Sequence, residues 1–447
     1  MGAFKAYDIR GVYNKDFDKD TVYKIGFFLP SLLKSDHVVV GRDVRTTSDE
    51  IFEYLCKGIN DAGCDVWNLG LATTPMVYFA TVHYEADASV QITASHNPPQ
   101  YNGLKISRTK AIPVGEDSGL RELQRMVETQ PIVPVAMDKR GKVIDKDVKP
   151  AYLTFLRKFV PDLSGLNLSI DCSHGMANLL IKDLLGTGHH YLYDHFDGTF
   201  PAHEPNPLEE KNCKDLEEAV IRNHSDLGII YDGDADRVMF IDENGRFIQP
   251  DYVTAVLGSY YLGKEKGNVL QDIRTSRSTT EYLEKMGATV YTWKVGHAYA
   301  KTKLRDIHGI FGGELAGHYY FRDFFNCDSG ILASLIVLQV LVRLKKEGKT
   351  FSQFIDSIIA YANSGETNFK LEQKDAAMAA LYDRYVTHDH PQNVMDFDGY
   401  RVEFPDWWFN VRKSNTEPYL RLVVEAKTQR MLDEKLAELS AIIRSFS

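Results

Sequence analysis

The feature that most constrains the fold is an alternation that repeats up to about residue 360. A short run of β-forming, largely apolar residues is followed by a polar loop and then by a segment with helical spacing of its apolar residues. Several of these runs are apolar at successive positions, as strands buried on both faces are. The alternation predicts layered α/β structure. The predicted strands are His37–Val40, Cys64–Leu69, Ala88–Ile92, Leu166–Asp171, Leu227–Tyr231, Val238–Asp242, Asn268–Ile273, Ala288–Trp293 and Ile310–Gly313.

At 447 residues the chain is longer than one hydrophobic core supports, so several domains are expected. Polar segments that suit domain boundaries lie at 131–149, 243–246 and 361–366, the last resembling a hinge. Beyond it the pattern changes to strands at Tyr400–Phe404 and Leu420–Ala426 and a closing helix at Met431–Ile443. We therefore predict three similar mixed α/β domains followed by a smaller C-terminal α+β domain. Their predicted ranges are 1–140, 141–246, 247–362 and 366–447.

Composition and charge exclude some classes of function. The formal net charge is −10 and charges of both signs are interleaved, which disfavours general affinity for nucleic acid. The five cysteines lack C-x-x-C spacing, as expected for reduced thiols. The longest apolar stretch, Ile331–Val342, is far shorter than the roughly 20 residues of a membrane span and is expected to be a core helix. The opening residues show no apolar signal region, so we expect a cytoplasmic protein that does not bind membranes.

The first candidate loop, T-A-S-H-N-P-P, directly follows the predicted strand Ala88–Ile92. Ligands of α/β sheets bind at the carboxyl ends of strands, so the Ser95 hydroxyl stands where a site forms. A neighbouring histidine, here His96, is a common activator of a serine. A polar turn and a serine hydrolase both remain open, although the pattern G-x-S-x-G is absent from this loop. Adjacent serine and histidine side chains also seldom face each other.

The second loop, D-G-D-A-D-R, lies between two apolar strands. The carboxylates of Asp232, Asp234 and Asp236 place more negative charge in one loop than is stable without neutralisation. A hard cation with oxygen ligands is the natural partner, and Mg²⁺ is the usual one in phosphate chemistry. Arg237, the next residue, suits an anionic phosphate. The loop therefore predicts a magnesium site.

An EF-hand calcium loop is the strongest rival interpretation of these residues. Asp232, Asp234, Asp236 and Glu243 fall at its positions 1, 3, 5 and 12. Arg237 stands at position 6, where the EF-hand needs a glycine, and the flanking runs predict strands instead of helices. These two differences favour the magnesium site.

Further loops supply groups suited to a sugar and to a phosphate. The loop G-E-L-A-G-H carries Glu314 as an acceptor for sugar hydroxyls, with His318 nearby in sequence. Upstream, W-K-V-G-H places Lys294 and His297 after another predicted strand. The loop R-K-S-N-T-E-P combines Arg412 with two hydroxyl residues, as a phosphate cradle would. Each loop alone is also consistent with a polar turn, but together they predict phosphoryl transfer on a sugar phosphate.

In this combination the chain resembles the α-D-phosphohexomutase family, and most closely its phosphomannomutase/phosphoglucomutase branch. The resemblance covers essentially the whole chain and rests on four motifs in the family's order and approximate spacing. The opening A-Y-D-I-R-G and the N-G-L-K-I that follows the serine loop match further family signatures. The resemblance implies three similar α/β domains and a smaller fourth domain around a deep central cleft.

The resemblance also implies a role for each motif residue. Ser95 corresponds to the phosphorylated serine, and one of its phosphate oxygens would complete the Mg²⁺ site. The other implied Mg²⁺ ligands are Asp232, Asp234 and Asp236. The sugar loop contributes Glu314, Ala316 and His318. The phosphate that is not transferred is expected on Arg412, Ser414, Asn415 and Thr416. The remaining expected site residues are Tyr7, Arg10, His96, Lys105, Arg237, Arg274 and His297.

Two positions depart from the common family pattern. The sugar loop often has a serine where this chain has Ala316, and the Arg274 position is often lysine, which keeps the charge but changes the geometry. Both departures leave mannose and glucose open as the sugar.

The expected activity is interconversion of hexose 1-phosphate and hexose 6-phosphate through phospho-Ser95 and a hexose 1,6-bisphosphate, with Lys105 or His297 as general base. We expect a monomer or small homo-oligomer. A phosphoglucosamine mutase is disfavoured by Asn415, where that branch usually has glycine. A sugar phosphatase remains open on the same residues, and so does a non-catalytic protein that binds Ca²⁺ or a sugar phosphate.

Overall fold

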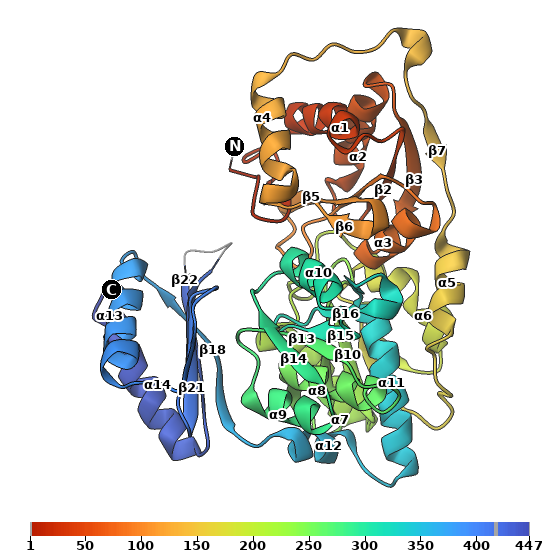
Figure 1. Ribbon diagram of the computed structural model, residues 1–447. Coiled ribbons are helices and arrows are strands. Elements are labelled where there is room, and N and C mark those ends of the chain that lie inside the picture. The colour runs from red at the N-terminus through yellow and green to blue at the C-terminus, as the bar shows by residue number, and fades with distance from the viewer. Residues whose placement is uncertain (1, 415–418, 447) are drawn as a thin grey trace. The chain divides into compact units, whose positions relative to one another are not determined.

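The computed structural model describes residues 2–414 and 419–446 (Figure 1). By its internal contacts the chain divides into two compact units. The first unit comprises Met1–Ile248 and Ala316–Ser352, and the second comprises Gln249–Leu315 and Gln353–Ser447.

The first unit begins with a mixed sheet in the order β1-β5-β4-β2-β3-β7, with β6 paired to β5. Its strands are β1 (Ile9–Val12), β2 (His37–Arg42), β3 (Asp65–Leu71), β4 (Ala88–Ile92), β5 (Tyr101–Arg108), β6 (Ile112–Pro113) and β7 (Val143–Asp145). Strands β2, β3 and β4 are parallel, whereas β5 runs antiparallel to both β4 and β1. Helices lie on both faces, with α3 on the opposite side from the others (Figure 1). They are α1 (Lys19–Leu33), α2 (Ser48–Asp61), α3 (Thr74–His83) and α4 (Leu120–Thr129).

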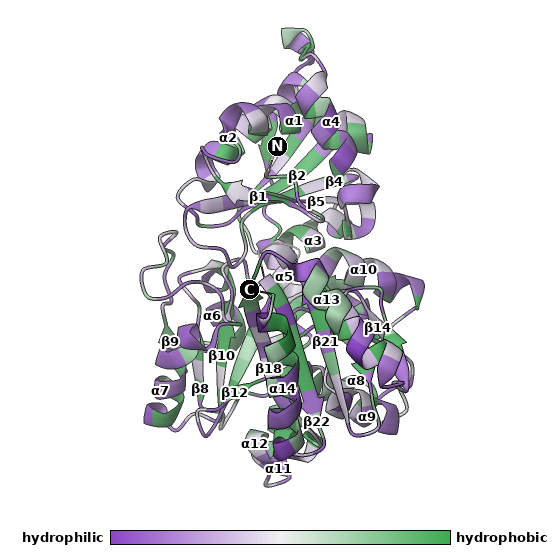
Figure 2. Ribbon diagram, turned by 90° about the vertical axis from the view of Figure 1, so that its left-hand side faces the viewer, coloured by the Kyte–Doolittle hydropathy of each residue, from purple (hydrophilic) through white to green (hydrophobic). Residues whose placement is uncertain are grey.

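A second mixed sheet in the first unit has the order β12-β11-β10-β8-β9. Its strands are β8 (Leu168–Asp171), β9 (His190–Leu192), β10 (Leu227–Tyr231), β11 (Val238–Asp242) and β12 (Phe247–Ile248). Strands β10 and β11 form an antiparallel hairpin, and every residue of both strands is buried. Figure 2 shows β10 as largely hydrophobic, as a strand covered on both faces should be. The helices of this part are α5 (Lys149–Arg157), α6 (Ile181–Leu185), α7 (Lys214–Asn223) and α11 (Gly330–Lys346).

Helix α11 contains the apolar stretch Ile331–Val342, which the sequence predicted to be a core helix, and most of its side chains are buried. In the part of the chain that the structure describes, no helix is long and apolar enough to cross a membrane. Before α11, the first unit also contains the antiparallel strands β16 (Tyr319–Phe321) and β17 (Cys327–Asp328).

The second unit contains the parallel strands β13 (Asn268–Asp272), β14 (Thr289–Trp293) and β15 (Phe311–Gly313), with β13 between the other two. The helices that accompany them are α8 (Pro250–Tyr261), α9 (Arg277–Lys285) and α10 (His297–Asp306). This arrangement is the third α/β part that the alternating pattern predicted.

The second unit ends in an antiparallel sheet in the order β18-β22-β21-β20-β19. Its strands are β18 (Ala362–Lys370), β19 (Asn393–Met395), β20 (Tyr400–Glu403), β21 (Trp407–Lys413) and β22 (Tyr419–Ala426). The remaining helices of the chain are α12 (Phe351–Ile358), α13 (Lys374–Tyr382) and α14 (Gln429–Arg444). Helices α13 and α14 lie on the same side of this sheet (Figure 1), which is α+β architecture. The predicted fold class of three mixed α/β parts and one α+β part is therefore confirmed.

The segment 361–366, predicted as a hinge-like linker, is not irregular, because β18 begins at Ala362. The polar residues that suggested a linker pair with β22 around a bulge between Asn363 and Glu366. The Asn363 side chain donates to Glu425 Oε2 at 3.0 Å, and Val424 N–H donates to Ser364 Oγ at 2.9 Å. The polar residues here mark a β-bulge, where side chains accept or donate hydrogen bonds that the backbone pairing leaves open.

Candidate active site

Ser95 lies in the loop after β4, at the carboxyl end of a strand in the middle of its sheet. Its backbone is in the left-handed region, with φ of 52°, and the residue is 2% exposed. The Ser95 N–H donates to Thr93 Oγ1 at 2.8 Å, and the Ser95 hydroxyl donates to Asp232 Oδ2 at 2.9 Å. The hydroxyl is therefore bound to the aspartate loop predicted to hold a metal.

His96 Nδ1 is 3.4 Å from Ser95 Oγ, farther than the Asp232 carboxylate. A contact of that length is weak, because O–H···N bonds in proteins are normally well below it. The structure thus favours Asp232 over His96 as the group that orients the Ser95 hydroxyl.

The aspartate loop joins β10 to β11, so strands flank it, as the argument against an EF-hand required. Asp232, Asp234 and Asp236 are all fully buried, and their ligand oxygens lie within 4.8 Å of one another. The loop approaches the serine loop so closely that a Cβ on Gly233 would stand 2.5 Å from the Ser95 carbonyl oxygen. Glycine is required at this position for the two loops to meet.

Lys105, on β5, bridges two of the three carboxylates. Its Nζ lies 2.7 Å from Asp234 Oδ2 and 2.5 Å from Asp236 Oδ2. Burial raises the pKa of Asp232, and repulsion by the other two carboxylates raises it further. Burial also acts to raise the pKa of Asp234, but Lys105 outweighs it and the net shift is downward. Burial would lower the pKa of Lys105, yet attraction by Asp234 and Asp236 raises it overall.

The charge pairs of this cluster leave one carboxylate more than cations. Asp232 pairs with Arg237, whose Nε lies 3.1 Å from Asp232 Oδ2, whereas Asp234 and Asp236 share the single ammonium of Lys105. Within residues 2–414 and 419–446, Oδ1 of Asp234 and Oδ1 of Asp236 accept no hydrogen bond although both atoms are buried. Unsatisfied buried carboxylate oxygens are costly, and hard cations such as Mg²⁺ prefer such ligands. The residues therefore fit the predicted Mg²⁺.

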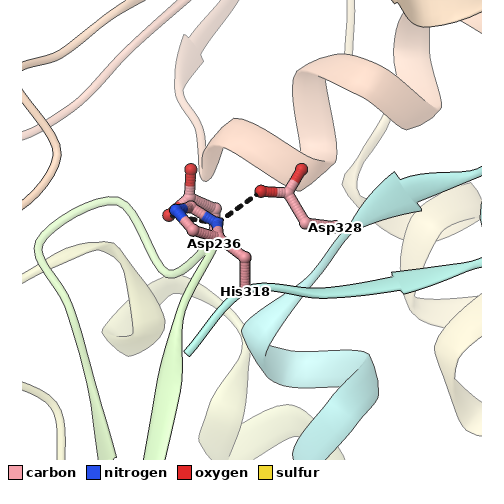
Figure 3. A group of neighbouring side chains, drawn as sticks. All are labelled: Asp236, His318 and Asp328. Carbon is pink, nitrogen blue, oxygen red and sulfur yellow. Dashed lines mark hydrogen bonds and ion pairs between the residues drawn. The ribbon is translucent and has the colours of Figure 1, made fainter. Parts of the chain in front are cut away.

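His318 also contacts this cluster within the first unit. Its Nδ1 lies 2.6 Å from Asp328 Oδ2 and 3.8 Å from Asp236 Oδ1 (Figure 3). Because a carboxylate accepts, Nδ1 carries the proton, and Asp328 fixes the orientation of the ring. Sequence reasoning missed Asp328, since it lies ten positions after His318 on the paired strand β17 and no motif marks it.

Arg10, on β1, reaches the serine loop. Its NH1 donates to Asn97 Oδ1 at 2.8 Å, and its NH2 pairs with Asp8. Tyr7 precedes the strand and is partly exposed. Both residues therefore lie in the first unit with Ser95, and Arg10 contacts the loop directly.

The second unit holds two further predicted arginines, each paired with a carboxylate. Arg274 NH2 lies 2.8 Å from Asp272 Oδ2, and Arg274 NH1 lies 3.1 Å from Glu366 Oε2. Arg412 Nε lies 3.3 Å from Asp398 Oδ1. Sequence reasoning missed Glu366 and Asp398, because isolated acidic residues on strands and loops carry no signal of their partners.

Glu366 and Asp398 each accept a hydrogen bond from a second group in the second unit. Glu366 Oε1 accepts from Arg421 NH1 at 2.8 Å, and Asp398 Oδ2 accepts from Val295 N–H at 2.8 Å. Arg412 and Arg421 stand directly opposite each other on β21 and β22. Like charges in that position repel, so the two carboxylates stabilise the pair.

The remaining predicted residues are divided between the units. Glu314 accepts from Gly296 N–H at 2.7 Å in the second unit, where His297 begins α10 and is buried. Ala316 belongs to the first unit with His318, so the boundary between the units falls inside the predicted sugar loop. Ser414 follows β21. Asn415 and Thr416 lie outside the described residues.

Comparison with known proteins gives the same answer along the whole chain. Four domain families of phosphoglucomutase/phosphomannomutase match the chain in order. They are alpha/beta/alpha domain I at 1–131, domain II at 150–245, domain III at 249–361 and the C-terminal domain at 366–442. Phosphomannomutase of Escherichia coli strain K12 is 38% identical over 439 residues, covering 96% of this chain and 95% of that one. Phosphomannomutase of Salmonella montevideo is 37% identical over 439 residues, with the same coverage.

Among solved structures, a phosphoglucomutase/phosphomannomutase family protein of Burkholderia thailandensis superposes with a TM-score of 0.89 at 28% identity. The superposition covers 99% of this chain and 97% of that one. The chain belongs to the phosphoglucomutase/phosphomannomutase family. It is accordingly an isomerase of carbohydrate metabolism of the phosphotransferase (mutase) type, which confirms the predicted family and enzyme class.

Proposed function

We propose that the chain interconverts hexose 1-phosphate and hexose 6-phosphate, with mannose or glucose as the sugar, through phospho-Ser95 and a hexose 1,6-bisphosphate. The observation that carries the proposal is the hydrogen bond from the Ser95 hydroxyl to Asp232, inside a buried three-carboxylate cluster. A serine held there is suited to store a phosphoryl group and to release it to a sugar hydroxyl.

In the first half-reaction the bond between phosphorus and Ser95 Oγ breaks while a bond to the free sugar hydroxyl forms, giving the bisphosphate. In the second half-reaction the other phosphate returns to Ser95. Asp232, Asp234 and Asp236 would hold Mg²⁺, which when bound would neutralise charge on the transferring group. Arg10 and Arg237 add positive charge near the loop, so little further chemistry is required of the protein.

The proton of the sugar hydroxyl needs an acceptor, and the contacts of His318 make it a further candidate. Lys105 is unsuited as a base while Asp234 and Asp236 raise its pKa. His318 is oriented by Asp328 in the manner of a general base held by a carboxylate. We propose His318 for this role in place of Lys105, with His297 kept as the second candidate.

For the second unit we propose that Arg274 and Arg412 bind the phosphate that is not transferred and Glu314 a sugar hydroxyl. Each of these arginines is already paired with a carboxylate, which offsets its charge when no phosphate is bound. The two curated relatives described above are named phosphomannomutases, which favours mannose, and Ala316 leaves glucose open.

The test is Ser95→Ala, which should lower mutase turnover by at least about 10³-fold. Labelled hexose 1,6-bisphosphate should place one phosphate on a peptide containing Ser95 in the wild-type protein and none in the variant. Ser89→Ala is the control, since Ser89 is a buried serine on β4 whose hydroxyl accepts from Thr81 at 2.7 Å. Near-native turnover in Ser95→Ala would contradict the proposal.

A side-by-side assay then identifies the sugar. Mannose, glucose and N-acetylglucosamine phosphates are compared at equal concentration, with product isomer and inorganic phosphate both measured. Isomer formation supports the mutase, whereas inorganic phosphate without isomer would show a phosphatase instead.

A further inference from the structure

Arg45, in the loop after β2, binds the serine loop extensively and belongs to none of the motifs. Its side chain is fully buried. Its NH2 donates to the carbonyl oxygens of Ser95 at 2.9 Å and Asn97 at 2.6 Å. Its NH1 donates to those of Pro98 at 2.8 Å and Tyr101 at 3.1 Å. One guanidinium therefore binds four carbonyls in and just after the loop that carries Ser95.

The fifth donor of Arg45 is also used. Its Nε lies 3.1 Å from Asp43 Oδ2. A guanidinium has five N–H donors, so none of them remains for a phosphate or a sugar. The pair with Asp43 is neutral as a whole, and it adds no net charge to the carboxylate cluster. Arg45 is therefore suited to shape the loop and unsuited to bind substrate.

Asp43 extends this contact to the amide of Ser95. Its Oδ2 accepts from Thr93 Oγ1 at 2.7 Å, and Thr93 Oγ1 in turn accepts from Ser95 N–H at 2.8 Å. The carbonyl and the amide of Ser95 are thus both fixed, one by Arg45 directly and one through Thr93. We name Asp43, Arg45 and Thr93 the clamp.

The clamp explains how Ser95 is held in an unfavourable conformation. A non-glycine residue with φ near 52° is less stable than in the right-handed regions, because its Cβ approaches the backbone. In this conformation the Ser95 carbonyl faces Arg45 and Gly233, while the hydroxyl faces Asp232. Without the clamp the loop can relax, and the hydroxyl then leaves the carboxylate cluster.

We propose that Arg45 is a positioning residue for phosphoryl transfer, which fixes the Ser95 loop so that Oγ stays on the Asp232 cluster. This inference rests on the proposed function, because it assigns Arg45 to the phosphorylation of Ser95. Lysine cannot replace arginine here, since an ammonium has three donors on one atom and cannot serve four carbonyls and a carboxylate at once.

The experiment compares Arg45→Lys with wild type in a single-turnover transfer of label from hexose 1,6-bisphosphate to Ser95. The transfer rate is expected to fall on the order of 100-fold, as for a reacting group misplaced by about 1 Å. The KM for sugar phosphate should stay within about twofold, because uniform binding is untouched. In Arg45→Ala, added methylguanidinium should restore part of the rate, which a general loss of packing would not allow.

Arg246→Lys is the matched control. Arg246 is an arginine of the first unit whose Nε lies 2.8 Å from Asp242 Oδ2, and Asp242 is buried like Asp43. The transfer rate of this variant should equal that of wild type. If the Arg45 variants do not fold, Thr93→Val takes their place, since it removes the hydroxyl that links Asp43 to the Ser95 amide and should slow transfer about tenfold.

The outcomes separate this inference from the proposed function. If wild-type Ser95 accepts no label, the proposed function and this inference both fall. If wild type is labelled and folded Arg45→Lys, or Thr93→Val in its place, is labelled within about threefold of the same rate, only the role of Arg45 falls. A raised KM with an unchanged transfer rate would also overturn it.

Discussion

The charged groups of the two units differ in how carboxylates and cations balance. Around Ser95 the carboxylates outnumber the cations, and Asp234 and Asp236 must share Lys105. In the second unit the charges balance, because three arginines pair with three carboxylates: Arg274, Arg412 and Arg421 with Asp272, Glu366 and Asp398. One unit is short of positive charge around its serine, and the other has its predicted phosphate-binding arginines neutralised in advance.

This difference matches the two proposed tasks. A carboxylate excess attracts a divalent cation, and the cation in turn attracts the transferring phosphoryl group. Arginines that already have carboxylate partners can exchange them for a phosphate with little change in the burial of charge.

The largest effect is expected for Lys105→Met. Removing the one cation between Asp234 and Asp236 leaves buried charge uncompensated, so the metal-free protein should lose about 3–5 kcal/mol of stability. Mg²⁺ stabilises a protein by binding its folded state only. It should restore more stability in the variant than in wild type, because the variant has no ammonium between the two carboxylates. Urea unfolding with chelator and with Mg²⁺ measures both effects.

Lys182→Met is the control for that comparison, because Lys182 pairs with Asp194 at the surface. Surface ion pairs contribute at most about 1 kcal/mol to the stability of the folded protein. We expect the loss in this variant to be the same with and without Mg²⁺. Equal losses in the two variants, or a loss in Lys105→Met that Mg²⁺ leaves unchanged, would show that the cluster does not hold a cation.

Eleven of the 22 described strands, and the position of the aspartate loop between two of them, could be predicted from sequence because their signals are local. Strands β4, β10 and β11 begin and end as predicted, since each is an uninterrupted run of mainly apolar residues bounded by polar ones. The three aspartates at alternate positions indicated their own chemistry. Antiparallel β5 was missed, because its residues Asn102, Gly103 and Lys105 are polar or small.

The groups that hold the site could not be predicted, because their partners are distant in sequence. Arg45 lies 50 residues before Ser95, and Glu366 lies 92 residues after Arg274. An arginine in a loop looks the same in sequence whether solvent or four carbonyls surround it. Only the fold brings these residues together, so motif reasoning singled out candidate reacting groups and missed the residues that contact them.

The second prediction concerns Asp251, whose carboxylate accepts the backbone N–H groups of Ser276 and Tyr252 in the second unit. Burial raises the pKa of Asp251 to about 7, from 3.8. Between these values the folded protein keeps the proton and the unfolded chain releases it, so stability falls as pH rises through this window.

Asp251→Asn should remove that dependence. Relative to wild type, the variant should gain stability between about pH 4 and about pH 7, by at most about 1.4 kcal/mol per pH unit, and the difference should level off above that window. Chemical unfolding of both proteins across this range measures it. A constant difference at all pH values would show that Asp251 titrates normally in the folded protein.

The smallest effect is expected for Glu366→Gln, which tests whether a carboxylate stands where a phosphate would bind. Glu366 neutralises Arg274 and Arg421, so the neutral side chain should leave both more attractive to an anion. Inhibition by inorganic phosphate should strengthen about fivefold, equivalent to roughly 1 kcal/mol at a partly exposed site.

Asp375→Asn is the control, because Asp375 pairs with the exposed Lys413 at 2.7 Å and should leave inhibition unchanged. Unchanged or weaker inhibition in Glu366→Gln would mean that Glu366 supports the arginines structurally and does not compete with phosphate. The contrast between the two units would then rest on the Ser95 cluster alone.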